Sequence, residues 1–341
     1  MKTTREIRVG IVGMGWAGGA HLEFWRNVPG SQVVALCSER PLDLSSFAPV
    51  HPIKAYQDYR EMLRDRDIDV IDLCTKPSLH AAQAVAAAQA GKHVIIEKPA
   101  VLSRDELTEV SSAVRKAGVQ AAVCFELRFS KQFEMSRSLI EQGMLGHIHY
   151  AECDYFHGIG SWYGLYRWNQ KKLDGGSSLL TAGCHALDVL RMLIDDPVEE
   201  VTALSTQSKH ADFARYEFPT TTVVLMKTRE GRILKVSSCI DALQPYTIRT
   251  HLLGSAGTLL DNRLYTEKIH GMRKDWAVLP TTLADSGDVK DLPYGAFFEA
   301  VTAAIAAGEP IPRVGLDEAF ETHRIIFAAD EAATTGKPVR L

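Results

Sequence analysis

The chain has 341 residues, of which 46% are apolar and 23% are charged, and this composition predicts a folded protein with two domains. Its 38 basic and 42 acidic residues give a net charge of −4, so we expect no nucleic-acid partner. No segment has the roughly 18 apolar residues of a membrane span, and six scattered cysteines without a CxxC pair predict reduced thiols in the cytoplasm and no metal site.

Residues 1–124 alternate short β-rich runs with amphipathic stretches. We expect strands at residues 7–13, 32–38, 68–75, 93–99 and 119–125. Helices are expected from the first glycine-rich turn to about residue 28, near residues 58–64, and at 79–91 and 103–117. This alternation predicts an α/β fold with a doubly wound parallel sheet, the architecture of a dinucleotide-binding domain.

A glycine-rich turn stands between the first strand and the first helix. Gly13, Gly15 and Gly18 form the pattern G-x-G-x-x-G in the strand–turn–helix context that dinucleotide binding requires. Backbone N–H groups and the helix dipole would face the phosphates. The predicted cofactor contacts here are Gly13, Met14, Gly15, Trp16, Ala17 and Gly18, whereas His21 and Trp25 are expected to pack.

The end of the second strand bears on the choice between NAD and NADP. An NAD enzyme usually places an acidic residue there for the ribose hydroxyls, but this chain has Ser38 followed by Glu39 and Arg40. Ser38 and Arg40 suit a 2′-phosphate through charge-assisted hydrogen bonds, and Glu39 suits a ribose diol. The sequence favours NADP weakly and leaves both cofactors open.

A second set of motifs lies in residues 72–100, which read DLCTKPSLHAAQAVAAAQAGKHVIIEKPA. Thr75, Pro77 and His80 form a TPxxxH-like loop, and Glu97-Lys98-Pro99 follows a predicted strand. The segment resembles the N-terminal domain of the Gfo/Idh/MocA oxidoreductases, the family of glucose-fructose oxidoreductase and inositol dehydrogenase. Residues 143–148, 175–188 and 336–341 extend the resemblance over the whole chain.

The resemblance implies that Lys98 lies at the nicotinamide end of the cofactor and is catalytic. A cation beside the reacting C–OH group stabilises a developing alkoxide, and partial burial can lower the pKa of the amine enough for proton transfer. Lys76 stands where the family commonly has proline. The resemblance adds these residues to the predicted cofactor site: Thr75, Lys76, Pro77, His80, Glu97, Lys98 and Arg128.

Residues 125–341 have a different texture and are expected to form a substrate-binding and oligomerisation domain. After a helix at residues 131–143, longer strand-like runs occur at 147–158, 199–209, 220–228, 232–240 and 246–255. These runs predict an α+β domain with a large, open and mainly antiparallel sheet. Because the exposed face of such a sheet needs cover, we expect a homodimer or homotetramer.

A helix from about residue 178 is expected to carry the second catalytic group. Thr181 and His185 lie four residues apart on one face, and Asp188 lies one turn further on. The family resemblance makes His185 the proton-transfer residue, and an imidazole suits neutral pH. The family's sugar and inositol dehydrogenases typically have aspartate where this chain has Thr181, which puts more of the proton transfer on Lys98.

Aromatic and polar residues before that helix predict a sugar or polyol site, because aromatic faces stack on sugar C–H surfaces and polar side chains bind hydroxyls. The predicted substrate contacts are Lys98, Arg128, His157, Trp162, Tyr163, Arg167, Trp168, Thr181 and His185.

Three functions fit this sequence. The favoured one is an NAD(P)-dependent dehydrogenase or reductase acting on a secondary hydroxyl of a sugar, sugar derivative or cyclitol. The second is a glycoside lyase or hydrolase that oxidises a sugar carbon transiently and returns the hydride. The third is a non-catalytic dinucleotide sensor, which the retained Lys98 and His185 disfavour.

Overall fold

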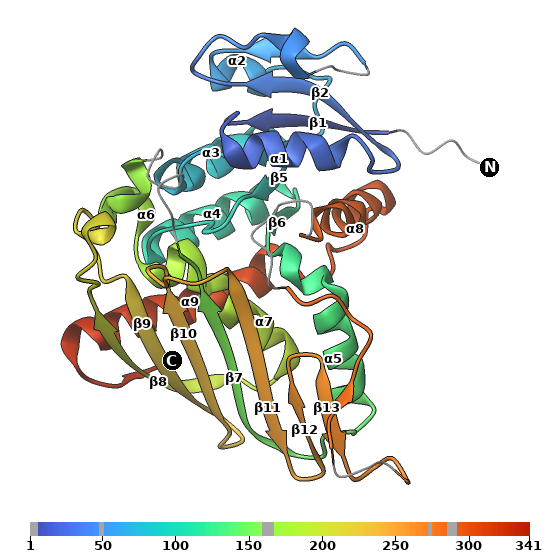
Figure 1. The fold of residues 1–341 in the computed structure, drawn as a ribbon. Coiled ribbons are helices and arrows are strands. Elements are labelled where there is room, and N and C mark those ends of the chain that lie inside the picture. Colours follow the sequence, from blue (N-terminus) through green and yellow to red (C-terminus); the bar gives the residue numbers. More distant parts are fainter. Residues whose placement is uncertain (1–5, 48–50, 159–166, 272–274, 285–291) are drawn as a thin grey trace. The chain divides into compact units, whose positions relative to one another are not determined.

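A computed structural model describes residues 6–47, 51–158, 167–271, 275–284 and 292–341 (Figure 1). The chain divides into two compact units. One comprises residues 1–126 and 293–320, and the other comprises 127–292 and 321–341. The chain first passes from one unit to the other after residue 126, close to the boundary expected at residue 124. Residues 293–320 then return to the first unit, whereas the sequence was divided into two consecutive parts.

The first unit is built on a six-stranded parallel sheet in the order β3-β2-β1-β4-β5-β6. Its strands are β1 (Ile7–Val12), β2 (Ser31–Cys37), β3 (Lys54–Tyr56), β4 (Val70–Leu73), β5 (His93–Ile96) and β6 (Ala121–Val123). Its helices are α1 (Trp16–Trp25), η1 (Leu44–Phe47), α2 (Tyr59–Leu63), α3 (Pro77–Gln89), α4 (Arg104–Ala117) and α8 (Tyr294–Ala307). The predicted doubly wound sheet is confirmed.

The strand order reverses between β1 and β4, and this reversal places the predicted cofactor motif. Right-handed crossovers on either side of such a point put α1 on one face of the sheet and α3 on the other. All four residues of β4 are buried, as expected for a strand covered on both faces. Ligands of such sheets bind beyond the carboxyl ends of the strands at this reversal, where the glycine turn lies.

Helix α8 covers α1 with aromatic side chains. Phe298 is fully buried, and its ring stacks on the Trp25 indole with centroids 4.2 Å apart. Tyr294, at the start of α8, lies 5.1 Å from the His21 ring between centroids. This aromatic burial accounts for the return of residues 293–320 to the first unit.

The second unit contains a nine-stranded sheet in the order β14-β13-β12-β11-β7-β10-β9-β8-β15. Neighbouring strands in this sheet run antiparallel, except β7 and β10, which run parallel to each other. The strands are β7 (Ile148–Phe156), β8 (Val198–Thr206), β9 (Thr221–Thr228), β10 (Ile233–Cys239), β11 (Thr247–Gly254), β12 (Gly257–Leu260), β13 (Arg263–Thr266), β14 (Ala277–Val278) and β15 (Val339–Arg340). This arrangement confirms the predicted mainly antiparallel sheet.

Helices cover one face of this sheet. α7 (Cys184–Leu193) packs on β7 and β10, and α5 (Lys131–Glu141) packs on α7, as Figure 1 shows. The other helical segments are α6 (Lys172–Gly175), α9 (Leu316–Thr335), and the short helices η2 (Glu126–Phe129), η4 (Arg167–Gln170) and η6 (Ala211–Phe213). Among the described helices, none combines the length and apolarity that a membrane crossing needs.

The opposite face of the sheet carries exposed apolar side chains. Residues of β9 alternate between buried and exposed, with Val223 and Leu225 on the exposed side. Leu204 of β8 is 75% exposed, and Ile233 of β10 is also exposed. In the described part of the second unit, this face therefore has an apolar surface at β8, β9 and β10.

Two glycines of the turn after β1 are required by close backbone approach. Gly13 has φ +92°, and a Cβ there would lie 2.7 Å from the Cys74 carbonyl oxygen. A Cβ on Gly18 would overlap the Gly13 carbonyl oxygen. The turn, the start of α1 and the residues after β4 therefore leave no room for a side chain at positions 13 and 18.

We expect Gly18→Ala to lower the free energy of unfolding by about 1–3 kcal/mol, because the added methyl group meets backbone that cannot move cheaply. Gly19→Ala is the matched control. It adds the same methyl group one residue later in α1, where nothing lies within 4 Å, and should raise stability by about 0.5–1 kcal/mol. Urea denaturation of both variants measures this, and equal effects would contradict the packing.

Candidate active site

The glycine turn presents the N-terminus of α1 at the carboxyl edge of the parallel sheet. Gly15 is the N-cap of α1 and provides no side-chain cap to the helix. The N–H groups of the first helical turn and the positive end of the helix dipole are suited to a phosphate group. The turn at residues 13–18 thus offers backbone groups suited to a phosphate, and the predicted cofactor contacts of these residues stay predictions.

Ser38, Glu39 and Arg40 follow β2 at the same edge of the sheet. The Ser38 hydroxyl accepts a hydrogen bond of 3.2 Å from the Arg40 backbone N–H, which closes a tight turn. Glu39 and Arg40 are exposed. Both the carboxylate and the guanidinium can therefore reach a ligand that passes β2.

The loop after β4 is fixed by His80 of α3, which is buried. Its Nδ1 lies 2.9 Å from the Pro99 carbonyl oxygen and its Nε2 lies 2.9 Å from the Thr75 carbonyl oxygen. Burial lowers the pKa of His80 even though both carbonyl groups favour its charged form. His80 thus connects the Thr75 loop to the segment after β5. Lys76 is the N-cap of α3, and Pro77 begins that helix.

Behind this edge, the first unit buries an ion pair. His21 Nδ1 lies 2.9 Å from Asp72 Oδ2, and both side chains have no exposed surface. The Trp25 indole N–H donates to the same carboxylate at 2.8 Å. Burial alone lowers the pKa of an imidazole, but the Asp72 carboxylate outweighs it and raises the pKa of His21 well above its usual value.

Glu97 and Lys98 follow β5 beside this ion pair. His21 Nε2 lies 3.5 Å from Glu97 Oε1. Burial raises the pKa of the Glu97 carboxyl, but the hydrogen bond from His21 and the charge of Lys98 outweigh it, so that pKa is lowered. Lys98 is half-buried. Burial and the Glu97 carboxylate raise the pKa of the neighbouring Glu126 to about 8.

Two groups of buried residues have metal-ligating atoms within 4.8 Å of one another, and both include His21. One adds Asp72 and Cys74, and the other adds Glu97 and Cys124. In both groups the ring nitrogen of His21 faces a carboxylate, and burial raises the pKa of the Cys74 thiol to about 12, which disfavours the thiolate that a metal needs. The geometry fits an internal ion pair, and we assign no metal here.

In the second unit, His185 lies in the first turn of α7 and is 5% exposed. The helix expected from residue 178 begins as a π-helix (Leu179–Gly183) before α7. Such π-turns are frequent at functional sites. Thr181 lies within the π-helix, and its hydroxyl donates to the Gly175 carbonyl oxygen at 3.0 Å. Thr181 thus ties the π-helix to the end of α6.

The His185 ring faces Tyr155, which belongs to an aromatic cluster with His157 and Tyr246, and the sequence did not point to Tyr155 or Tyr246. The rings of His185 and Tyr155 are nearly parallel, with centroids 6.3 Å apart. The Tyr155 hydroxyl lies 3.2 Å from His157 Nδ1, and the Tyr246 ring packs edge-on against Tyr155 and His157. The available signal was spacing, because Tyr155 and His157 lie two residues apart near the end of a strand and share one face.

Arg128 is buried in a bidentate ion pair within the second unit. Its Nε lies 2.5 Å from Asp188 Oδ2, and its second guanidinium nitrogen lies 2.7 Å from Oδ1. Thr322 of α9 donates to the same carboxylate at 2.8 Å. This contact gives Arg128 a structural role in joining η2, α7 and α9, and the predicted cofactor and substrate contacts of Arg128 stay predictions.

The remaining predicted substrate residues lie in the segment before α6. Trp162 and Tyr163 lie outside the described residues. Arg167 and Trp168 belong to η4, where Arg167 is exposed and Trp168 is half-buried. His157 and Thr181 lie in the same unit as Arg167 and Trp168.

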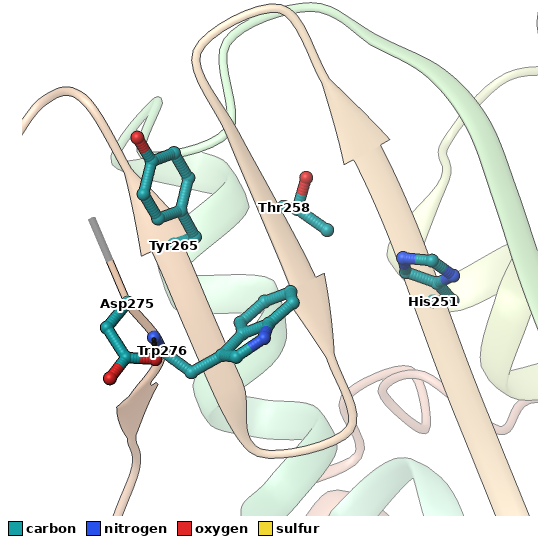
Figure 2. Close-up of a pocket in the computed structure, with 5 residues that line it drawn as sticks. All are labelled: His251, Thr258, Tyr265, Asp275 and Trp276. Atoms are coloured by element: carbon teal, nitrogen blue, oxygen red, sulfur yellow. Dashed lines mark hydrogen bonds between the residues drawn. The ribbon is translucent and has the colours of Figure 1, made fainter.

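A shallow pocket of about 340 Å³ lies elsewhere in the second unit, lined by His251, Thr258, Tyr265, Asp275 and Trp276 (Figure 2). His251 pairs with Glu152 of β7 in the sheet. Glu152 and Tyr155 lie three residues apart on β7, so their side chains point to opposite faces. The pocket therefore opens on the face away from Tyr155 and His185, and no predicted site residue lines it.

Family models match both parts of the chain. Residues 7–125 match the model described as "Oxidoreductase family, NAD-binding Rossmann fold". Residues 133–260 match the model described as "GFO/IDH/MocA C-terminal domain".

Characterised and uncharacterised relatives agree with these matches. The chain is 26% identical to an uncharacterised oxidoreductase, YrbE, of Bacillus subtilis, over 99% of this chain and 97% of the relative. It is 24% identical to myo-inositol 2-dehydrogenase of Thermotoga maritima, over 82% and 80%. It is 26% identical to a glycosyl hydrolase family 109 protein of Porphyromonas gingivalis, over 74% of this chain and 59% of that protein.

Solved structures share the fold over the whole length. The WlbA dehydrogenase of Bordetella pertussis, in complex with NADH and UDP-GlcNAcA, has a TM-score of 0.84 at 23% identity, covering 100% of this chain and 99% of that one. The scyllo-inositol dehydrogenase of Lactobacillus casei, with bound NAD(H) and scyllo-inositol, has a TM-score of 0.81 at 18% identity, covering 98% and 99%.

The raised pKa of Glu126 predicts a pH dependence of stability. Its carboxyl keeps a proton up to about pH 8 in the folded chain but loses it near pH 4.5 when unfolded. Stability from this group is therefore full below pH 4.5 and lost as pH rises through about 8. Glu126→Gln removes the titration, so the unfolding free energy of the variant should gain on the wild type by about 1.4 kcal/mol per pH unit between pH 5 and 8.

Urea denaturation at unit steps from pH 5 to 8 measures this difference. Parallel curves for the two proteins would mean that Glu126 is ionised throughout the folded range.

Proposed function

This chain belongs to the Gfo/Idh/MocA family of NAD-binding oxidoreductases, and we propose that it is a dehydrogenase or reductase acting on a sugar, sugar derivative or cyclitol. The observation that carries the proposal is the position of two motifs in the first unit. The glycine turn follows β1, and Glu97-Lys98 follows β5 at the same edge of the parallel sheet. A phosphate cradle and a reactive cation thus belong to one surface.

NAD, when bound, accepts or donates a hydride at its nicotinamide ring. The task of the protein is then to hold a secondary hydroxyl or ketone and to move its proton. Lys98 is suited to this because its charge stabilises an alkoxide and its half-buried amine can exchange a proton. The Asp72 carboxylate stabilises the protonated form of His21, and the Glu97 carboxylate stabilises the charge of Lys98, at this edge of the sheet.

His185 is the proposed second proton-transfer residue. An imidazole can take the hydroxyl proton at neutral pH, and the π-turn before α7 fits a functional position. Thr181 gives this ring no carboxylate, and its hydroxyl donates to Gly175. We therefore propose that Lys98 carries the larger share of the proton transfer.

A sugar or cyclitol fits the second unit best among small substrates. Tyr155 faces His185 and packs with Tyr246 and His157, and such rings offer both an apolar face and a polar edge. The myo-inositol and scyllo-inositol dehydrogenases similar to this chain support this substrate class. Trp168 and Arg167 are further proposed contacts.

Glycoside cleavage through transient oxidation is the second candidate. The similarity to glycosyl hydrolase family 109 proteins favours it, as does His157, which accepts or donates at the Tyr155 hydroxyl and could act as the base for the acidified C–H group. This reaction would leave the cofactor unchanged after each turnover. Product analysis without net formation of reduced nicotinamide distinguishes it from a dehydrogenase.

We also propose that a second copy of the chain covers the exposed face of β8, β9 and β10, where Leu204 and Leu225 stand in solvent. Sedimentation of the full chain at micromolar concentration tests this proposal, which a solely monomeric protein would contradict.

A screen of sugars and cyclitols with NAD⁺ and NADP⁺, followed by absorbance of the reduced nicotinamide, tests the activity. On the best substrate, Lys98→Ala and His185→Ala should each lower turnover by about 10² or more, as expected for a lost acid–base group. Cofactor affinity should change far less. Lys116→Ala, which changes an exposed lysine of α4, is the control for Lys98, and near-wild-type turnover of His185→Ala would reject its proposed role.

The cofactor choice can be tested at Arg40. We propose NAD as the cofactor, with binding of NADP through Ser38 and Arg40. Arg40→Ala should weaken NADP⁺ binding about tenfold, because one charge-assisted contact to the 2′-phosphate is lost, and should leave NAD⁺ binding unchanged. Calorimetric titration measures both, and a wild type that does not bind NADP⁺ would show that Glu39 governs this pocket.

A further inference from the structure

The first unit buries a histidine whose two ring nitrogens face two different carboxylates. His21 Nδ1 lies 2.9 Å from Asp72, and Nε2 lies 3.5 Å from Glu97. His21 has no exposed surface, and Glu97 is also buried. A neutral imidazole has one N–H donor, so favourable contacts with both carboxylates require the doubly protonated imidazolium.

The arrangement of charges supports an imidazolium. Asp72, His21, Glu97 and Lys98 form a series in which negative and positive groups alternate. A buried charge is tolerated only when it is paired. If His21 were neutral, Asp72 and Glu97 would be two buried carboxylates with one cation, Lys98, at one end.

Other polar groups around this series do not replace His21. Trp25 donates to Asp72, and the Tyr294 hydroxyl lies 3.5 Å from Glu97, but neither carries a positive charge. Titratable groups near His21 and Glu97 come from several elements of the unit: Asp72 and Cys74 at β4, His80 of α3, Cys124 and Glu126 after β6, and Tyr294 of α8. Among them, His80 has its ring at backbone carbonyl groups, which leaves His21 as the internal cation for Glu97.

We propose that His21 is a positioning residue: as an imidazolium between Asp72 and Glu97, it keeps the Glu97 carboxylate ionised beside Lys98, and through Glu97 it governs the proton affinity of the Lys98 amine. The significance for catalysis rests on the proposed function of Lys98. The electrostatic relation itself lies within the first unit and does not depend on a substrate.

The proposal predicts the direction of the effect. In His21→Asn, the side-chain amide can still donate to Asp72, but the imidazolium that faced Glu97 is lost and Lys98 remains as its neighbouring cation. Glu97 is then buried near the carboxyl groups of Asp72 and Glu126 and takes up a proton. Lys98 loses its anionic neighbour, so its pKa falls by about one unit or more. Glu97→Gln removes the carboxylate directly and should have the same effect.

The test is competitive labelling of the full-length chain with a lysine-selective reagent from pH 6 to 11. Mass spectrometry of the Lys98 peptide gives the pKa of the amine without any substrate. We expect His21→Asn and Glu97→Gln each to lower that pKa by about one unit or more. We expect the double variant to match Glu97→Gln alone, because His21 acts through Glu97.

His93→Asn is the matched control. His93 lies in β5, and its Nδ1 accepts a hydrogen bond from the Gln120 backbone N–H, which the asparagine oxygen can also accept. This variant removes a histidine from the strand that precedes Glu97 and Lys98, outside the charge series, and the Lys98 pKa should stay unchanged. An unchanged or raised pKa in His21→Asn, or additive shifts in the double variant, would overturn the proposal.

A measurement on the wild type covers the case in which His21→Asn does not fold. Nitrogen-15 NMR of labelled histidine side chains should show both His21 ring nitrogens protonated at pH 8, where an exposed histidine is neutral. A neutral His21 ring at that pH would reject the imidazolium. If labelling gives the expected shifts but no sugar or cyclitol is oxidised, the positioning relation stands and the proposed function fails.

Discussion

The buried contact between His21 and Asp72 is the constraint on which the first unit depends. It joins α1 to β4, and the nearby Glu97 extends it to the end of β5. Burying such charges is costly unless they are well paired, and the attraction within the pair is stronger where apolar side chains cover it and keep the local dielectric low. Aromatic side chains of α8 supply that cover, since Phe298 and Tyr294 pack on the His21 ring. The return of a C-terminal helix to the N-terminal sheet therefore has an electrostatic reason as well as an apolar one.

The fold was largely predictable because its signals are local. Apolar strands alternating with amphipathic helices fix a parallel sheet, and the observed bounds of α4 and of β7 to β11 differ from the expected ranges by only a few residues. The features that the sequence did not reveal depend on distant partners. The short β3 forms by pairing with β2, and the parallel pair of β7 and β10 interrupts an otherwise antiparallel sheet. Neither has a periodicity of its own.

The site was predictable where a motif sets it and not where burial sets it. Positions 13 and 18 require glycine because backbone atoms lie too close for a Cβ, and the G-x-G-x-x-G pattern makes this requirement visible in the sequence. His21 and Trp25 were expected only to pack, and they do pack, but both also donate to one buried carboxylate. The overlooked signal was Asp72 in an apolar strand, because a carboxylate in that position must find donors on a neighbouring element. The π-turn before α7 could not be predicted, because no sequence pattern in residues 179–183 distinguishes it from an ordinary helix.

The two units distribute charge differently, and this bears on how a proton would be handled. The first unit surrounds Lys98 with ionisable groups, among which Glu97 is ionised and Glu126 holds its proton near neutral pH. In the second unit, His185 faces the aromatic ring of Tyr155, and the carboxylate of Asp188 is bound by Arg128. Thr181 would stabilise an imidazolium at His185 only weakly, because its hydroxyl donates to the Gly175 carbonyl oxygen. A charge on Lys98 is stabilised by the ionised carboxylate of Glu97 beside it. In the proposed reaction, Lys98 therefore carries most of the proton transfer, and the aromatic residues of the second unit bind the ring of the substrate.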